Sequence, residues 1–145
     1  MNRTPGFSLV ELVVVLVIAT ILAALAIPRF TDVESKAAWY YEQVKAGVRY
    51  AQRQAVAQRR CVFVSVSATQ VQLFYDNKPT SCTISATSLT QVTNGQPYVL
   101  TAPSGVTINP VTNFSFNSLG QPSAPASLSL AGRTITVNAE TGYVQ

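Results

Sequence analysis

The sequence predicts an α+β fold, in which a long N-terminal helix packs on a small antiparallel β-sheet domain. Three stretches with different patterns predict it. Residues 12–28 carry no charge and come close to the length of a membrane-spanning helix. Residues 29–60 have the spacing of an amphipathic helix, and within residues 61–145 apolar and polar residues alternate with a period of two. The chain beyond the apolar stretch is long enough for one domain with a modest core.

The amphipathic half of the helix is predicted from one stripe of small and apolar residues. They recur at alternating steps of four and three, at Ala37, Tyr41, Val44, Val48, Ala51 and Ala55. Pro28 removes one backbone hydrogen bond, so we expect a kink where the membrane half meets the amphipathic half. The two halves together predict a rod of about 50 residues, roughly 75 Å long.

The C-terminal part is predicted to consist of short antiparallel strands. The first two, at residues 62–67 and 70–75, flank a turn at Ala68-Thr69. Turns that contain Gly, Pro or Asn separate the others, which are expected at residues 98–101, 106–108, 114–116, 127–130 and 133–138. The polar segment from Thr83 to Gln96 is predicted to be an exposed loop next to Cys82.

Glu11 is the one charge between Arg3 and Arg29, and it lies inside the apolar segment. A carboxylate in a bilayer costs about 2.5 to 3.5 kcal/mol on insertion scales, so its presence calls for a cationic partner. Cleavage after Gly6 gives Phe7 an α-amino group one helical turn from Glu11. In an assembly, the amine of one subunit can then neutralise the carboxylate of its neighbour.

The segment from Gly6 to Leu12 resembles the processing motif of type IV pilins and of type II secretion pseudopilins. In that family a dedicated prepilin peptidase removes a short basic leader, here residues 1–6, on the cytoplasmic side of the inner membrane. The resemblance implies that Phe7 becomes the N-terminus and is N-methylated, and that residues 7–28 form the transmembrane and assembly helix. It also implies that Glu11 guides docking into the filament.

An ordinary secretory signal peptide is the alternative interpretation of the same residues. Arg3 would be its basic region, residues 12–22 its apolar region and Ala24-Leu25-Ala26 its cleavage site, which would release a soluble periplasmic domain. The basic region is short, Glu11 interrupts the apolar start, and the apolar pattern continues beyond the cleavage site. These three features favour the pilin motif.

Further along the chain, the resemblance narrows to minor pilins and pseudopilins of the GspH/FimT type. Three segments carry it, at residues 48–56, 114–122 and 133–144. The junction at residues 27–30 also looks like that of pilins of the mannose-sensitive haemagglutinin type, where a minor pilin of this architecture occurs. The resemblance implies a type IV pilin fold, with an amphipathic helix at 29–60 and a β-rich head at 61–145.

Members of this group are thought to sit near the filament tip or to start its assembly. The resemblance therefore implies a minor pilin of a type IV pilus that helps to initiate assembly or caps the filament. The alternatives are a minor pseudopilin of a type II secretion system and a tip-located adhesive or DNA-binding subunit. The expected partners are other pilin or pseudopilin subunits, the prepilin peptidase, and the inner membrane before assembly, with the head in the periplasm.

Arg133 is the candidate DNA contact, because one DNA-binding subset resembles this chain at Gly132-Arg133. That subset has a second Arg two residues later, where Ile135 stands here, so DNA is not the favoured partner. Seven basic residues against three acidic ones lie between Arg29 and Arg60, whereas residues 61–145 are net neutral. The basic character therefore belongs to the helix and is typical of a solvated face and of contacts between subunits.

Cys61 and Cys82 lie in the part that the processing motif places in an oxidising compartment. A disulfide between them would close a loop of about twenty residues and stabilise the head by about 3 kcal/mol in the chain-entropy model. The sequence contains no histidine, and two thiols fall short of the four ligands of structural zinc, so we expect neither a metal nor a cofactor.

Catalysis is not expected either. Without histidine the chain lacks a Ser-His or Cys-His nucleophile system. Asp76 and Glu140 are the carboxylates beyond the helix, and they are too few and too far apart in sequence to predict an acid/base pair.

Overall fold

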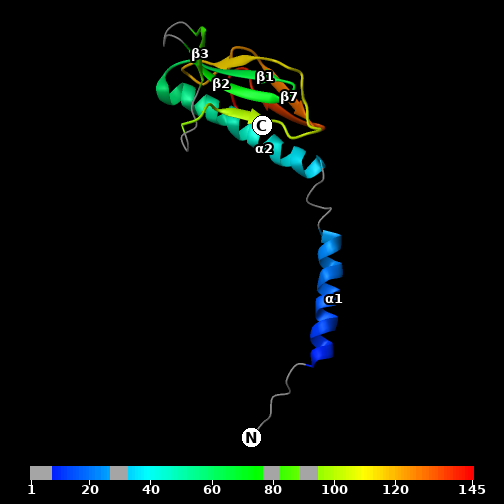
Figure 1. The fold of residues 1–145 in the computed structure, drawn as a ribbon. Coiled ribbons are helices and arrows are strands. Elements are labelled where there is room, and N and C mark those ends of the chain that lie inside the picture. Colours follow the sequence, from blue (N-terminus) through cyan, green and yellow to red (C-terminus); the bar gives the residue numbers. More distant parts are fainter. Residues whose placement is uncertain (1–7, 27–32, 77–81, 89–94) are drawn as a thin grey trace.

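The computed structural model describes residues 8–26, 33–76, 82–88 and 95–145 (Figure 1). Within these residues, two helices precede eight short strands. The helices are α1 (Leu9–Ala26) and α2 (Val33–Gln58). The strands are β1 (Val62–Ser67), β2 (Gln70–Asp76), β3 (Ile84–Ser88), β4 (Val99–Thr101), β5 (Ile108–Asn109), β6 (Phe114–Phe116), β7 (Ala126–Leu130) and β8 (Arg133–Val137).

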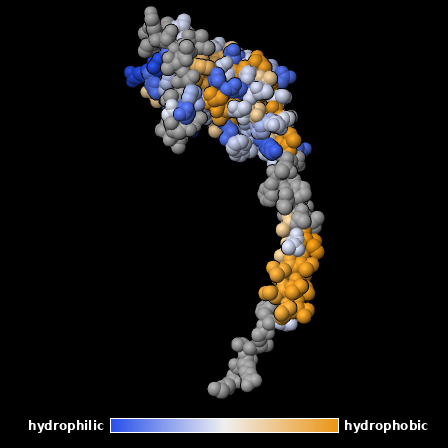
Figure 2. Space-filling view, in the orientation of Figure 1, coloured by the Kyte–Doolittle hydropathy of each residue, from blue (hydrophilic) through white to orange (hydrophobic). Residues whose placement is uncertain are grey.

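Helix α1 is apolar apart from Glu11 and Thr20, and Figure 2 shows its largely apolar surface. No helix in the described part of the chain is both long enough and apolar enough to span a membrane. Phe7 and residues 27–28, which the sequence assigns to the membrane segment, lie outside the described residues. The membrane helix over residues 7–28 and the kink at Pro28 therefore stay predictions.

Helix α2 buries the stripe that the sequence predicted. All six of its residues, from Ala37 to Ala55, are buried, which confirms this part of the prediction. Tyr40 and Gly47 are buried with them. Tyr40 is fully buried, and its hydroxyl donates a hydrogen bond to the Leu100 carbonyl at 3.0 Å, which satisfies the polar end of the side chain.

The strands form two antiparallel sheets. In the first sheet the order is β3-β2-β1-β6, and β4 also pairs with β2. In the second sheet the order is β5-β7-β8. The predicted hairpin is confirmed, because β1 and β2 pair from Val62 opposite Tyr75 to Ser67 opposite Gln70. The Ile108 amide also donates a hydrogen bond to the Ala68 carbonyl at 2.9 Å, so the second sheet begins against the turn of this hairpin.

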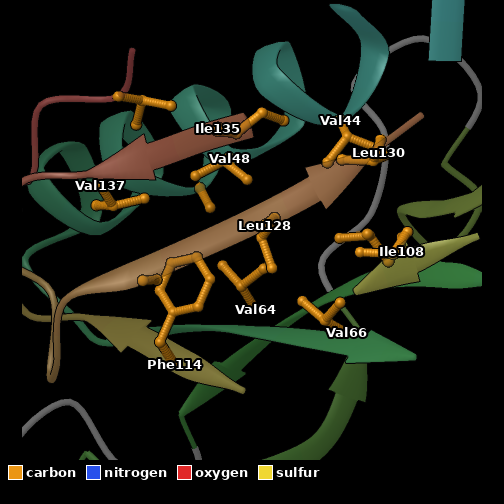
Figure 3. Close-up of a cluster of buried hydrophobic side chains, with 14 of the residues drawn as sticks. Val44, Val48, Val64, Val66, Ile108, Phe114, Leu128, Leu130, Ile135 and Val137 are labelled. Carbon is orange, nitrogen blue, oxygen red and sulfur yellow. The ribbon is translucent and has the colours of Figure 1, made fainter. Parts of the chain in front are cut away.

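The core lies between α2 and the two sheets (Figure 3). Alternate residues of the strands point into it, as the period of two predicts. In Figure 3, Val44 and Val48 of α2 face the side chains of both sheets, among them Val64, Val66, Phe114, Leu128, Leu130, Ile135 and Val137. One helix thereby holds the two sheets together.

The segment from Thr83 to Gln96 differs from the prediction. It was predicted to be an exposed loop, but Ile84–Ser88 forms strand β3, which pairs with β2 at Phe74 and Asp76. Its Ser- and Thr-rich composition is compatible with either state, and the free edge of β2 supplies the hydrogen-bonding partner. Residues 89–94 of the same segment lie outside the described residues.

Candidate assembly site and head surface

Glu11 lies in the first turn of α1 with its side chain exposed. The exposed fraction of the large apolar side chains of α1 ranges from 48% at Val13 to 77% at Leu9. A helix that is apolar all round requires burial, either among other helices or in a membrane. Gly6 and Phe7, the predicted processing residues, lie outside the described residues.

The polar groups of α1 differ in how they are satisfied. The Thr20 hydroxyl donates a hydrogen bond to the Val17 carbonyl within the helix, at 2.8 Å. Among the residues that the structure describes, Glu11 takes part in no ion pair.

The C-terminal end of α2 is tied to the sheet through Asp76. Arg59, with a φ of 50°, ends the helix, and the chain turns so that Arg60 reaches the last residue of β2. Arg60 Nε donates to Asp76 Oδ1 at 2.9 Å, and Arg60 Nη2 donates to the Asp76 carbonyl. The Cys61 amide donates to the other carboxylate oxygen at 3.3 Å, so both oxygens of this buried group have a partner.

The disulfide lies at the same junction. Cys61 and Cys82, which the sequence predicted to pair, form a disulfide with their Cα atoms 5.2 Å apart. Cys61 is buried between the end of α2 and the start of β1, and Cys82 precedes β3. Sequence reasoning missed the role of Asp76, because its partner Arg60 is 16 residues away in the sequence.

Arg133 is exposed at the start of β8, next to the N-terminal half of α2. Its guanidinium lies 5.8 Å from the centre of the Tyr41 ring, and the Lys45 ammonium lies 5.7 Å from the same centre. Glu34 lines a pocket of about 160 Å³ together with Arg133, so an acidic group offsets part of the positive charge there. Glu34 would also repel a phosphate that approached Arg133.

Ile135 stands at the position where the DNA-binding subset carries its second Arg. Its side chain is fully buried in the core. The position where that subset carries a second Arg is therefore a packing position in this chain. The structure does not bring a second cation to Arg133 from β8.

A third region lies where α2 meets two turns of the head. The Gln52 side-chain amide donates to the carbonyls of Gly120 and Thr141, each at 3.1 Å. The Gln121 side chain joins the turns to each other by donating to the Glu140 carbonyl at 3.2 Å. Sequence reasoning did not single out Gln52, because its partners are 68 and 89 residues away.

The two carboxylates considered for catalysis have different surroundings. Asp76 is buried in its ion pair, whereas Glu140 is exposed in a turn. The described residues hold no group of three or more Cys, Asp or Glu side chains placed to bind a metal ion.

Two family descriptions match the sequence. The prokaryotic N-terminal methylation motif matches residues 1–27, and the type II transport protein GspH matches residues 41–142. The chain belongs to the GspH family. No curated protein matches it significantly.

Solved structures show the same fold. The type IV minor pilin FimU of Pseudomonas aeruginosa, in one crystal form, is 15% identical, with 77% of this chain and 90% of FimU covered and a TM-score of 0.52. A second crystal form is 14% identical, with 81% and 89% covered and a TM-score of 0.55. The chain thus has the type IV pilin fold, and with its family this gives a minor pilin or pseudopilin of a type IV pilus or a type II secretion system.

Proposed function

We propose that this GspH-family chain is a minor pilin that helps to initiate a type IV pilus or caps its filament. The exposed apolar surface of α1, with Glu11 in its first turn, carries the proposal. Such a helix is stable when similar helices surround it, and its carboxylate then selects the position of the neighbour that supplies a cation.

The cation is proposed to be the α-amino group of Phe7 on an adjacent subunit. It arises when the prepilin peptidase removes residues 1–6 by cleavage after Gly6, and N-methylation comes next. The match of residues 1–27 to the N-terminal methylation motif supports this processing. Glu11 then acts in assembly and leaves the fold of the head unchanged.

Before assembly, residues 7–28 are proposed to cross the inner membrane once, with the head in the periplasm. The Cys61–Cys82 disulfide supports this location, because disulfides persist in oxidising compartments. The role is proposed to be structural, without catalysis and without a cofactor. DNA is not the favoured ligand, since Glu34 lies beside Arg133 and Ile135 is buried.

A minor pseudopilin of a type II secretion system is the second candidate. The description of the matching family as a type II transport protein favours it. Deleting the gene and measuring both surface pili and secreted protein separates the two. Loss of pili with normal secretion supports the pilin, loss of secretion with normal pili supports the pseudopilin, and no change in either contradicts both.

A further inference from the structure

Three large apolar side chains are exposed in the region where α2 meets two turns of the head. Val56 of α2 is 49% exposed, Leu119 is 76% exposed, and Tyr143 is 60% exposed. Leu119 adjoins Gly120 and Tyr143 adjoins Gly142, in the two turns that Gln52 holds. We call these three residues, with Arg49 and Arg53 of α2, the Leu119 surface.

The backbone of the Leu119 surface is pre-formed by two glycines. Gly142 has a φ of 68°, and a Cβ there would overlap the Gly120 carbonyl oxygen. Gly120 has a φ of 80°, and a Cβ there would lie 2.9 Å from a methyl group of Val56. The turns therefore approach each other, and α2, more closely than other residues permit.

Hydrogen bonds inside the turns add to this rigidity. The Asn117 side chain accepts from the amides of Leu119 and Gln121, each at 2.9 Å, and the Asn138 side chain accepts from those of Glu140 and Thr141, each at 3.0 Å. Leu119 and Tyr143 are thus presented on fixed backbone. A pre-organised surface loses little conformational entropy when a partner binds.

The charge around these apolar side chains is basic. Arg49 donates to the carbonyl of Val144, the residue after Tyr143, at 3.0 Å, and Arg53 is exposed one helical turn before Val56. Glu140 is the acidic residue of the neighbouring turn. A second copy of this chain that bound through the same surface would place the same arginines opposite each other, which like-charge repulsion disfavours.

We propose that the Leu119 surface binds the head of a different pilin-like subunit, through a patch that is apolar at its centre and acidic at its rim. This proposal rests on the proposed function, since it places the chain beside other subunits. Tyr and Arg side chains are common energetic anchors of protein interfaces, and the apolar Val56 and Leu119 favour a protein over a nucleic acid.

The test uses the full chain in cells that assemble the filament. A photo-crosslinking amino acid replaces Leu119 in one strain and Val111, 56% exposed outside this surface, in a control strain. We expect position 119 to cross-link a non-identical pilin-like subunit, identified by mass spectrometry, with an acidic patch on its head. Arg53→Glu should lower this yield several-fold, whereas Lys36→Glu, on an exposed position of the same helix, should leave it unchanged.

Several results would overturn the proposal. They are equal cross-linking from position 111, cross-linking to a second copy of the chain, an adduct with nucleic acid, or insensitivity to Arg53→Glu. Normal urea unfolding of each variant excludes misfolding as the cause. If the chain is absent from the filament, the proposed function fails; if it is present and position 119 cross-links no other subunit, this inference alone fails.

Discussion

The Asp76 carboxylate is buried at the end of β2, 2.9 Å from the Nε atom of Arg60, which follows α2 by two residues. The pair joins the helix to the first sheet beside the Cys61–Cys82 disulfide. Removing one member of a buried pair leaves the other without its partner, and this costs more than the pair contributes by itself.

Asp76→Asn should therefore destabilise the head. It leaves the Arg60 guanidinium without a counter-charge, and we expect the free energy of unfolding to fall by about 1 to 3 kcal/mol. Urea unfolding of the full chain in detergent measures this change. Glu140→Gln, at an exposed carboxylate, is the matched control and should stay within about 0.5 kcal/mol of wild type. Equal effects of the two substitutions would contradict the structural role of Asp76.

The disulfide predicts that the folded head contains no free thiol on Cys61 or Cys82. Thiol labelling of the oxidised chain should modify neither residue. Reduction should lower the free energy of unfolding by about 3 kcal/mol, the value expected for a loop of this length in the chain-entropy model. Complete labelling of both cysteines before any reductant is added would exclude the bridge.

We expect the folded chain to lose stability at high pH because of Tyr40. Burial raises the pKa of Tyr40 from 10.0 to about 12, so the folded chain retains a proton that the unfolded chain has lost in this range. The contribution to stability is full below pH 10 and is lost as the pH rises toward 12. Tyr40→Phe should flatten the fall in urea midpoint over this window. The same slope in both proteins would show that Tyr40 does not cause it.

Features formed by residues close together in the sequence could be predicted from it, whereas features that depend on distant residues could not. The buried stripe of α2 was predicted because a period of 3.6 is a property of one helix, and the β1–β2 hairpin because alternation and a turn are adjacent in sequence. Strand β3 was missed because its Ser and Thr residues match a loop equally well, and the edge of β2 that pairs with it is a tertiary feature.

The missed side chains share the same cause. Asp76 has the composition of a turn residue, and its burial depends on Arg60 from another element. Gln52 is not part of the buried stripe that the sequence predicts for the helix, and only the fold brings the turns at Gly120 and Thr141 to it. Positions that act through distant partners carry no periodic signal, so one sequence does not reveal them.

Processing predicts the first residue of the mature chain. Mass spectrometry should find Phe7 at the N-terminus, N-methylated, because we expect the peptidase to cut after Gly6. Gly6→Ala should be cut poorly, and larger side chains at position 6 should leave the leader in place. A mature chain that begins at Ile27 would instead support an ordinary signal peptide.

Glu11 predicts a defect in assembly without a defect in folding. Glu11→Leu removes the carboxylate but keeps the apolar character of α1, so cleavage after Gly6 and the stability of residues 33–145 should match wild type. Incorporation into the filament should fall, because the amine of Phe7 on the neighbouring subunit loses its counter-charge. Glu11→Asp keeps the charge with a shorter reach and should give an intermediate level. The measurement is the amount of subunit in sheared filaments, relative to the amount in the membrane. Normal incorporation of Glu11→Leu would show that the carboxylate is dispensable, as expected for a subunit at the very tip with no neighbour above it.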